Sequence, residues 1–142
     1  MTSDPQTPPR IAQTVIDSDD PRALAEFYRQ LFGLTYRDGD EPPPAGEPDE
    51  RGQDWLVLRN PDGVQLAFQR SEGWAPPTWG SPTRPQMMHL DTVVDSVEQL
   101  DRQRERAEEL GARTMYDRRD DPDEPLFVLV DPAGHPFCIF VA

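Results

Sequence analysis

Residues 126–140, LFVLVDPAGHPFCIF, decide the fold because they describe two apolar strands joined by a tight turn. The turn is Asp131–Gly134, in which proline fixes φ and glycine takes a positive φ. Residues 55–68, WLVLRNPDGVQLAF, follow the same plan, with Asn60–Gly63 as the turn. The chain therefore carries the same hairpin twice, which indicates an internal repeat.

A strand, a helix and a short strand precede each hairpin in the same order. In the first half, strand 13–17 leads to a helix that begins after the N-cap Asp20 and ends at Gly33. In the second half, strand 89–94 leads to a helix that is capped by Ser96 and ends at Gly111. The short strands are expected at 34–37 and 112–116. The apolar positions recur at helical spacing, which predicts a buried stripe of Leu24, Phe27, Tyr28 and Leu31 in the first helix and of Val97, Leu100, Ala107 and Leu110 in the second.

The repeat predicts an α+β fold of two tandem βαβββ modules that form one compact domain. We expect the first module over residues 11–70 and the second over residues 87–142. Residues 71–86 contain four prolines and two tryptophans and are interpreted as a linker. Residues 1–10 are expected to form a flexible tail, and the acidic, proline-rich stretch 38–50 a solvated surface loop.

Composition excludes several classes of function for this chain of 142 residues. Asp and Glu outnumber Lys and Arg by 27 to 14, and the net charge of −13 disfavours binding to nucleic acid or to an anionic membrane. Neither a membrane span nor a signal peptide is visible, so a cytoplasmic location is expected. Cys138 is the single cysteine, which excludes an internal disulfide and any zinc site with two thiolates from one chain.

The tandem βαβββ repeat resembles the vicinal oxygen chelate superfamily, which includes glyoxalase I, extradiol dioxygenases, fosfomycin-modifying enzymes and bleomycin-binding resistance proteins. The resemblance covers residues 11–141 and is closest to the glyoxalase-like domain branch. It is carried by four stretches: Asp20–Tyr28, His89–Asp91, Leu110–Ala112, and Asp131–Gly134 before Phe137 and Cys138. The resemblance implies curved mixed sheets around one cavity that holds a small-molecule ligand, and it implies a homodimer.

Metal enzymes of this superfamily place ligands on the first and last strands of each module. The resemblance puts Gln13 and His89 at the first-strand positions, and Ala67 and Cys138 at the last-strand positions. Alanine cannot ligate a metal, and the remaining donors suit an oxygen-seeking divalent metal poorly. We therefore assign no metal firmly, keep a divalent metal as a possible cofactor, and name His89 and Gln13 as its candidate ligands.

Strand alternation places His89 and Asp91 on the face opposite Leu90 and Val94. If Leu90 and Val94 face the helix, His89 and Asp91 face the cavity. His89 is then the candidate catalytic residue, as a general base or a ligand-binding imidazole. The alternative is a structural histidine with a hydrogen-bonded ring.

The remaining candidates for ligand binding are Gln13, Gln65, Gln69, Cys138 and Trp55. The glutamines could line a wet cavity wall or an exposed strand face, and the cysteine could be a small buried apolar residue. Tryptophans 55, 74 and 79 could line the cavity, or they could cover the linker or a partner subunit. His135 lies in the second turn and is expected to face solvent.

Three functions fit these observations. The first is a small-molecule-binding protein with a degenerate metal site. The second is a glyoxalase-type lyase or isomerase, or a dioxygenase, that uses a weakly held metal. The third is an antibiotic-sequestering protein of the bleomycin-resistance kind, in which the negative charge would attract a cationic drug.

Overall fold

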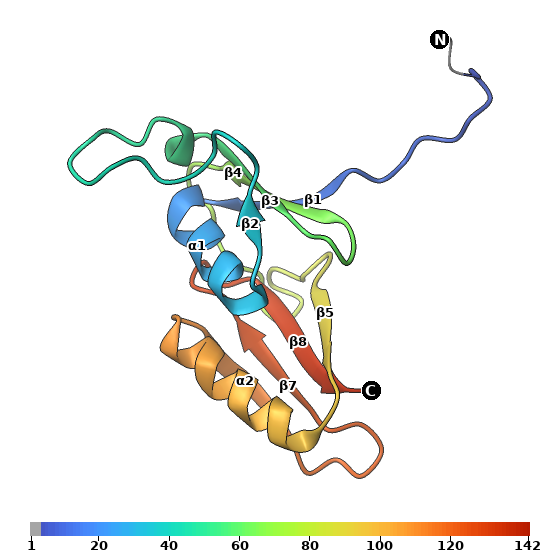
Figure 1. Cartoon of the computed structure of the whole chain (residues 1–142). Helices are drawn as coiled ribbons and strands as arrows, with labels where there is room; N and C mark the ends of the chain where they lie inside the picture. The colour runs from blue at the N-terminus through green and yellow to red at the C-terminus, as the bar shows by residue number, and fades with distance from the viewer. Residues whose placement is uncertain (1–3) are drawn as a thin grey trace.

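A computed structural model describes residues 4–142, so residues 1–3 of the expected tail lie outside the described residues. The first module consists of β1 (Gln13–Ser18), α1 (Pro21–Phe32), β2 (Thr35–Tyr36), β3 (Trp55–Arg59) and β4 (Gln65–Arg70), with a short 3-10 helix at Arg51–Gln53. The second consists of β5 (Leu90–Val94), α2 (Val97–Glu109), β6 (Arg113–Arg118), β7 (Leu126–Val130) and β8 (Pro136–Val141). The predicted α+β fold of two βαβββ modules is confirmed (Figure 1).

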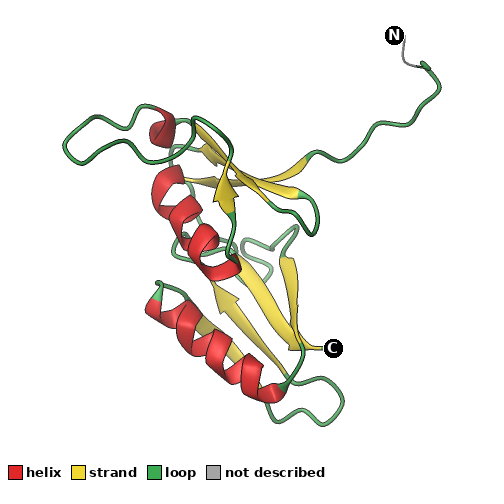
Figure 2. Cartoon of the chain, viewed as in Figure 1, coloured by secondary structure: helices red, strands yellow, loops and turns green. Residues whose placement is uncertain are grey.

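Each module folds its four strands into one mixed sheet, and the two sheets have the same order. The first sheet runs β1-β4-β3-β2 and the second runs β5-β8-β7-β6. In both sheets the first and last strands of the module are parallel, and the remaining pairs are antiparallel. The sheets are separate, which leaves β1 and β5 as edge strands (Figure 2).

Asp20, Gly33 and Ser96 cap the helices as predicted, whereas the C-cap of α2 is Leu110, one residue before the predicted Gly111. The Asp20 carboxylate accepts a hydrogen bond from the Ala23 amide at 3.1 Å, and Gly33 ends α1 with a φ of 65°. The Ser96 hydroxyl accepts from the Gln99 amide at 3.0 Å. Of the two hairpin glycines, Gly134 has the expected positive φ of 97°, but Gly63 is not among the glycines with a positive φ.

The two modules share one apolar core beneath the helices. Phe27 and Tyr28 of α1 meet Phe137 of the second sheet edge-to-face, with ring centroids 6.0 and 6.2 Å apart. Tyr28 also stacks on Phe68 of the first sheet. The Arg106 guanidinium of α2 donates to the carbonyl oxygen of Leu31 at 2.9 Å. Helix α1 is therefore packed against both sheets, so the sheet faces opposite the helices are the ones left for a ligand.

A buried carboxylate links the modules through hydrogen bonds. The Tyr28 hydroxyl donates to Asp131 Oδ2 at 2.7 Å, and the backbone amides of Ala133 and His135 donate to Asp131 Oδ1. The His135 ring lies 2.9 Å from the same carboxylate and stacks on Trp74 with centroids 4.3 Å apart. The expectation that His135 faces solvent is wrong, because the linker tryptophan covers its ring and leaves 18% of the side chain exposed.

The acidic stretch 38–50 forms a long loop beside the first module (Figure 1). Most of it is exposed, as expected for a solvated loop. The expectation is wrong for Asp40, whose side chain is completely buried. Its carboxylate accepts from the Arg51 guanidinium at 2.7 Å and from the Val57 amide at 2.9 Å. This carboxylate therefore ties the loop to β3.

Candidate functional site

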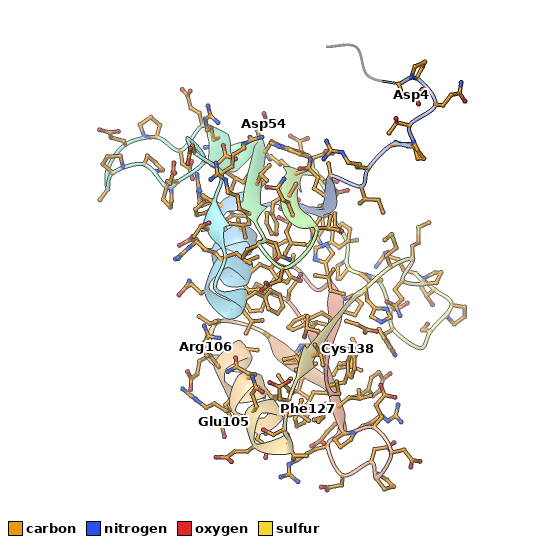
Figure 3. All side chains as sticks on the ribbon, turned by 45° about the vertical axis from the view of Figure 1, so that its right-hand side comes forward. Asp4, Asp54, Glu105, Arg106, Phe127 and Cys138 are labelled. Atoms are coloured by element: carbon orange, nitrogen blue, oxygen red, sulfur yellow. The ribbon has the colours of Figure 1, made fainter. Side chains whose placement is uncertain are left out.

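Three polar side chains meet at the edge of the second sheet, on the face opposite the helices. Asp91 of β5 lies directly across from Cys138 of β8 in the parallel register, and His89 lies two residues earlier on the same face as Asp91. The intervening Leu90 packs against the shared core, as does Val94 further along the strand. Strand alternation therefore places His89 and Asp91 away from the helices. Figure 3 labels Cys138 on the second sheet.

The side chains of His89, Asp91 and Cys138 are close enough to act together. His89 Nε2 lies 3.1 Å from Asp91 Oδ1, and one donor atom from each of the three residues lies within 4.8 Å of the others. The histidine side chain is 32% exposed and the aspartate side chain 61% exposed, whereas the cysteine is buried. A bound molecule could therefore reach the imidazole and the carboxylate directly.

Cys138 is a poor nucleophile in this environment. Burial raises the pKa of its thiol to about 11, and the negative charge of Asp91 contributes in the same direction. The thiol is therefore protonated at neutral pH, and the thiolate that nucleophilic catalysis requires is scarce. The Cys138 carbonyl oxygen accepts a hydrogen bond from the Thr92 hydroxyl at 2.8 Å, which ties β8 to β5.

An apolar wall surrounds this polar group. Cys138 belongs to a small buried cluster with Leu126 and Val128, and this cluster is separate from the shared core. Trp79, which comes from the irregular segment between β4 and β5, packs against it. The indole ring meets the imidazole of His89 edge-to-face, with centroids 5.2 Å apart. Trp79 is therefore part of the candidate site.

Two further residues of this wall were not found from the sequence. The β6–β7 register shifts between Thr114 and Tyr116, so Met115 is the extra residue of a β-bulge. Met115 packs against the small cluster, and the Tyr116 ring lies 6.4 Å from that of Trp79. A regular strand would place Met115 and Tyr116 on opposite faces of the sheet. Because the sequence carries no signal for the bulge, the two residues could not be assigned to the same wall from the sequence.

The glutamine candidates and Trp55 lie together on the first sheet. Gln13 pairs with Gln65 across β1 and β4, and Gln69 pairs with Trp55 across β4 and β3. Ala67 lies between the two glutamines of β4 and is fully buried. The structure therefore divides the predicted residues into two groups: this amide-rich group on the first sheet, and the group of His89, Asp91 and Cys138 on the second.

Two hollows on the surface lie away from the group of His89, Asp91 and Cys138. One of about 280 Å³ is lined by Glu26, Arg29, Tyr36 and neighbouring residues of β2 and the acidic loop. The other, of about 120 Å³, lies between the start of α1 and Trp74. Of the residues that the sequence suggested for ligand binding, Trp74 lines the second hollow, whereas His89, Asp91 and Cys138 line neither.

A resident oxygen-seeking metal does not fit the polar residues of the second sheet. Magnesium and calcium ions take six or more ligands that are mainly oxygen atoms. The three grouped side chains offer one imidazole nitrogen, one carboxylate oxygen and one thiol sulfur. Gln13, the other metal ligand proposed from the sequence, lies on the first sheet.

Comparisons with known proteins agree with the fold. The family described as the glyoxalase-like domain matches residues 13–140. A glyoxalase/dioxygenase structure from Nostoc punctiforme is 19% identical, with a TM-score of 0.67 over 99% of this chain and 96% of that chain. A glyoxalase/bleomycin resistance protein/dioxygenase family enzyme from Burkholderia phytofirmans PsJN is 19% identical, with a TM-score of 0.66 over 92% and 97%.

A lactoylglutathione lyase structure from Agrobacterium tumefaciens is 18% identical, with a TM-score of 0.59 over 96% of each chain. At these identities the structural likeness establishes the fold alone. A comparison with curated protein sequences found no match. Within residues 4–142, both helices are too short and too polar to cross a membrane.

Proposed function

Because the chain belongs to the glyoxalase-like domain family, which lies in the vicinal oxygen chelate superfamily, we propose that it binds a small molecule on the helix-free face of the second sheet. His89 and Asp91 supply the polar contacts, and Trp79 supplies an apolar wall. The observation that carries the proposal is the exposed imidazole–carboxylate pair beside a small buried cluster against which the partly buried Trp79 packs. Binding sites of this kind combine mostly apolar walls with a few polar groups that orient the ligand.

The charges around the site favour one class of ligand. Asp91 is a hydrogen-bond acceptor when it is ionised, and the net charge of −13 repels anions. The Trp79 indole lies beside the His89 ring, with centroids 5.2 Å apart, so a ligand that reaches the imidazole also meets an aromatic side chain. The expected ligand is therefore a small, largely apolar ring compound that carries a hydroxyl or amino group rather than a carboxylate.

Phenol, aniline and benzoate form a matched set of probes for this proposal, because they differ only in the polar group on one ring. In the presence of a metal chelator, we expect phenol and aniline, but not benzoate, to shift the NMR resonances of His89 and Trp79. His89→Ala and Trp79→Ala should each weaken this binding about tenfold, since each removes one side of the contact. Thr35→Ala, on β2 at the far edge of the first sheet, serves as the control and should leave binding unchanged. Equal binding of all three probes, or unchanged binding to His89→Ala, would contradict the proposal.

We also propose that a second copy of the chain covers the helix-free face of the second sheet. Strands β1 and β5 are sheet edges with unpaired backbone groups, and exposed apolar side chains lie on or just before them. These side chains are Ile11, Val15, Met87, Met88 and Val93. An apolar edge strand is a template for pairing with another chain. A homodimer would bury these residues and enclose the ligand site.

Sedimentation equilibrium tests the proposed dimer. We expect a dimer for the wild type and a monomer for the double variant Val15→Asp/Val93→Asp, because each chain would have to bury two added charges in the interface. Thr35→Asp adds a charge to β2, at the other edge of the first sheet, and should remain a dimer. A monomeric wild-type protein would refute the homodimer.

A further inference from the structure

We infer that the irregular segment of residues 78–84, called the cover loop below, is a preformed cover of the ligand site, and that Thr78 is the positioning residue that holds Trp79 beside His89. The inference deepens the proposed function and rests on it only for the ligand. The arrangement of the loop follows from its own contacts, which exist without a ligand.

Hydrogen bonds within the cover loop join its two ends. The Thr78 amide donates to the Arg84 carbonyl oxygen at 2.6 Å, and the Arg84 amide donates to the Thr78 hydroxyl oxygen at 3.0 Å. The same hydroxyl lies 3.2 Å from the carbonyl oxygens of Ser81 and Arg84, and it can donate its hydrogen to either. The Arg84 guanidinium donates to the Pro76 carbonyl oxygen at 3.1 Å and so ties the loop to the preceding segment. One threonine side chain therefore connects both ends of the loop with its middle.

A tight turn at the start of the cover loop sets the direction of Trp79. The Ser81 amide donates to the Thr78 carbonyl oxygen at 3.3 Å, which closes a turn of four residues. Trp79 is the second residue of this turn, and Gly80 is the third. Gly80 has a φ of 79°, the left-handed conformation that a type II turn requires at its third residue. A Cβ atom on Gly80 would also lie 3.2 Å from the Tyr116 hydroxyl oxygen, so glycine lets the turn approach β6 closely.

The turn places the indole of Trp79 among the other side chains of the site. Its ring centroid lies 5.2 Å from that of His89 and 6.4 Å from that of Tyr116, and the indole packs against the small buried cluster. A wall that is held in place before the ligand arrives loses little conformational entropy on binding, so it raises affinity. The competing interpretation is that apolar packing alone holds the indole, and that the Thr78 hydroxyl contributes nothing to its position.

The two histidines of the chain report separately on two indoles. The His89 ring lies beside Trp79, and the His135 ring stacks on Trp74. The ring current of each indole shifts the proton resonances of the imidazole next to it. Spectra would be recorded without ligand at one pH, with His89→Ala to assign the two imidazoles and Trp79→Leu to define the unshifted His89 position. The His135 resonances should be the same in every variant of the cover loop.

Three variants of the cover loop test the role of Thr78. Thr78→Val keeps the shape of the side chain but removes the hydroxyl, and it should move the His89 resonances most of the way to their positions in Trp79→Leu. Thr78→Ser keeps the hydroxyl and should retain the wild-type positions. Thr83→Val is the matched control, because it removes a threonine hydroxyl that is bonded in the middle of the same loop rather than between its ends.

Phenol affinity would be measured on the same proteins. Thr78→Val should weaken phenol binding about threefold, less than Trp79→Ala, because the indole is displaced rather than removed. Thr78→Ser and Thr83→Val should bind phenol as the wild type does. Gly80→Ala disturbs the turn by a different route, through backbone strain, and should change the His89 resonances and the phenol affinity in the same direction as Thr78→Val.

Unchanged His89 resonances in Thr78→Val, or equal changes in Thr78→Val and Thr83→Val, would overturn the inference. A displaced indole with unchanged phenol affinity would also overturn it, because the loop would then not shape the ligand site. If the wild-type protein does not bind phenol, the proposed ligand class fails, and the ligand-free spectra still decide whether Thr78 positions Trp79. The two proposals therefore fail separately.

Discussion

Asp131→Ala is expected to lower the free energy of unfolding by about 3–5 kcal/mol, because it removes the acceptor that several buried donors share. The Tyr28 hydroxyl loses its partner in a place where no water reaches it, since the tyrosine is 1% exposed. Burial, and secondarily the charge of Asp131, raises the pKa of this phenol well above its ordinary value, so it stays a donor. The amides of Ala133 and His135 lose the same acceptor, and the turn that they form loses its support.

Chemical denaturation monitored by tryptophan fluorescence would measure this loss, and the repeat supplies the control. Asn60 occupies the corresponding position in the first hairpin, and within residues 4–142 its side chain is bonded only inside its own turn, to the Asp62 amide and the Val64 carbonyl. Asn60→Ala should therefore cost less than about 1 kcal/mol. Tyr28→Phe, which removes a single donor, should fall between the two. A cost for Asp131→Ala as small as that for Asn60→Ala would show that the carboxylate does not join the modules.

The parts of the fold that local chemistry determines could be predicted from the sequence. Asp20, Gly33 and Ser96 mark helix ends because a side-chain oxygen or a left-handed residue satisfies backbone groups within one turn. The hairpins could be located because an Asx-Pro-x-Gly turn follows a run of apolar residues in each module. The order of these signals along the chain sufficed to predict two βαβββ modules.

The contacts between distant segments could not be predicted in the same way. The helical spacing placed Tyr28 in the core, but its partner Asp131 lies 103 residues further along the chain. His135 was assigned to solvent because it lies in a turn, and this was wrong because Trp74 comes from a segment without any periodic pattern. Irregular segments give no repeating signal from which their packing could be read.

The candidate site was predicted in part for the same reason. Alternation along one strand was enough to place His89 and Asp91 on the same face. The meeting of Asp91 with Cys138 depends on the register of two strands that α2 and the second hairpin separate in sequence. Alternation shows which residues of a strand share a face, but no tight turn joins β5 to β8, so no turn geometry specifies which residues of the two strands lie opposite each other.

The acidic loop provides the second large effect. Asp40→Ala is expected to lower the free energy of unfolding by about 2–4 kcal/mol, because the buried carboxylate accepts from a backbone amide and from two guanidinium groups. These donors are Val57 N at 2.9 Å, Arg51 at 2.7 Å and Arg37 at 3.0 Å. The two arginine side chains are about half exposed and can be rehydrated when the carboxylate is removed. The expected loss in the free energy of unfolding is therefore smaller than for a fully buried ion pair.

Asp38→Ala separates this contribution from the general effect of removing negative charge from the loop. The Asp38 side chain is 90% exposed and lies 3.4 Å from Arg59, so its loss should change stability by less than about 0.5 kcal/mol. Both variants remove one negative charge from a strongly acidic chain, and both are measured by the same denaturation experiment. If the two variants were equally stable, the buried Asp40 carboxylate would contribute no net stability, and the loop would be held by contacts such as those of Arg22, which pairs with Asp49 and donates to the Asp40 carbonyl. A difference of 2 kcal/mol or more would instead show that one buried aspartate attaches the loop to β3, because the two variants differ in burial and hydrogen bonding rather than in charge.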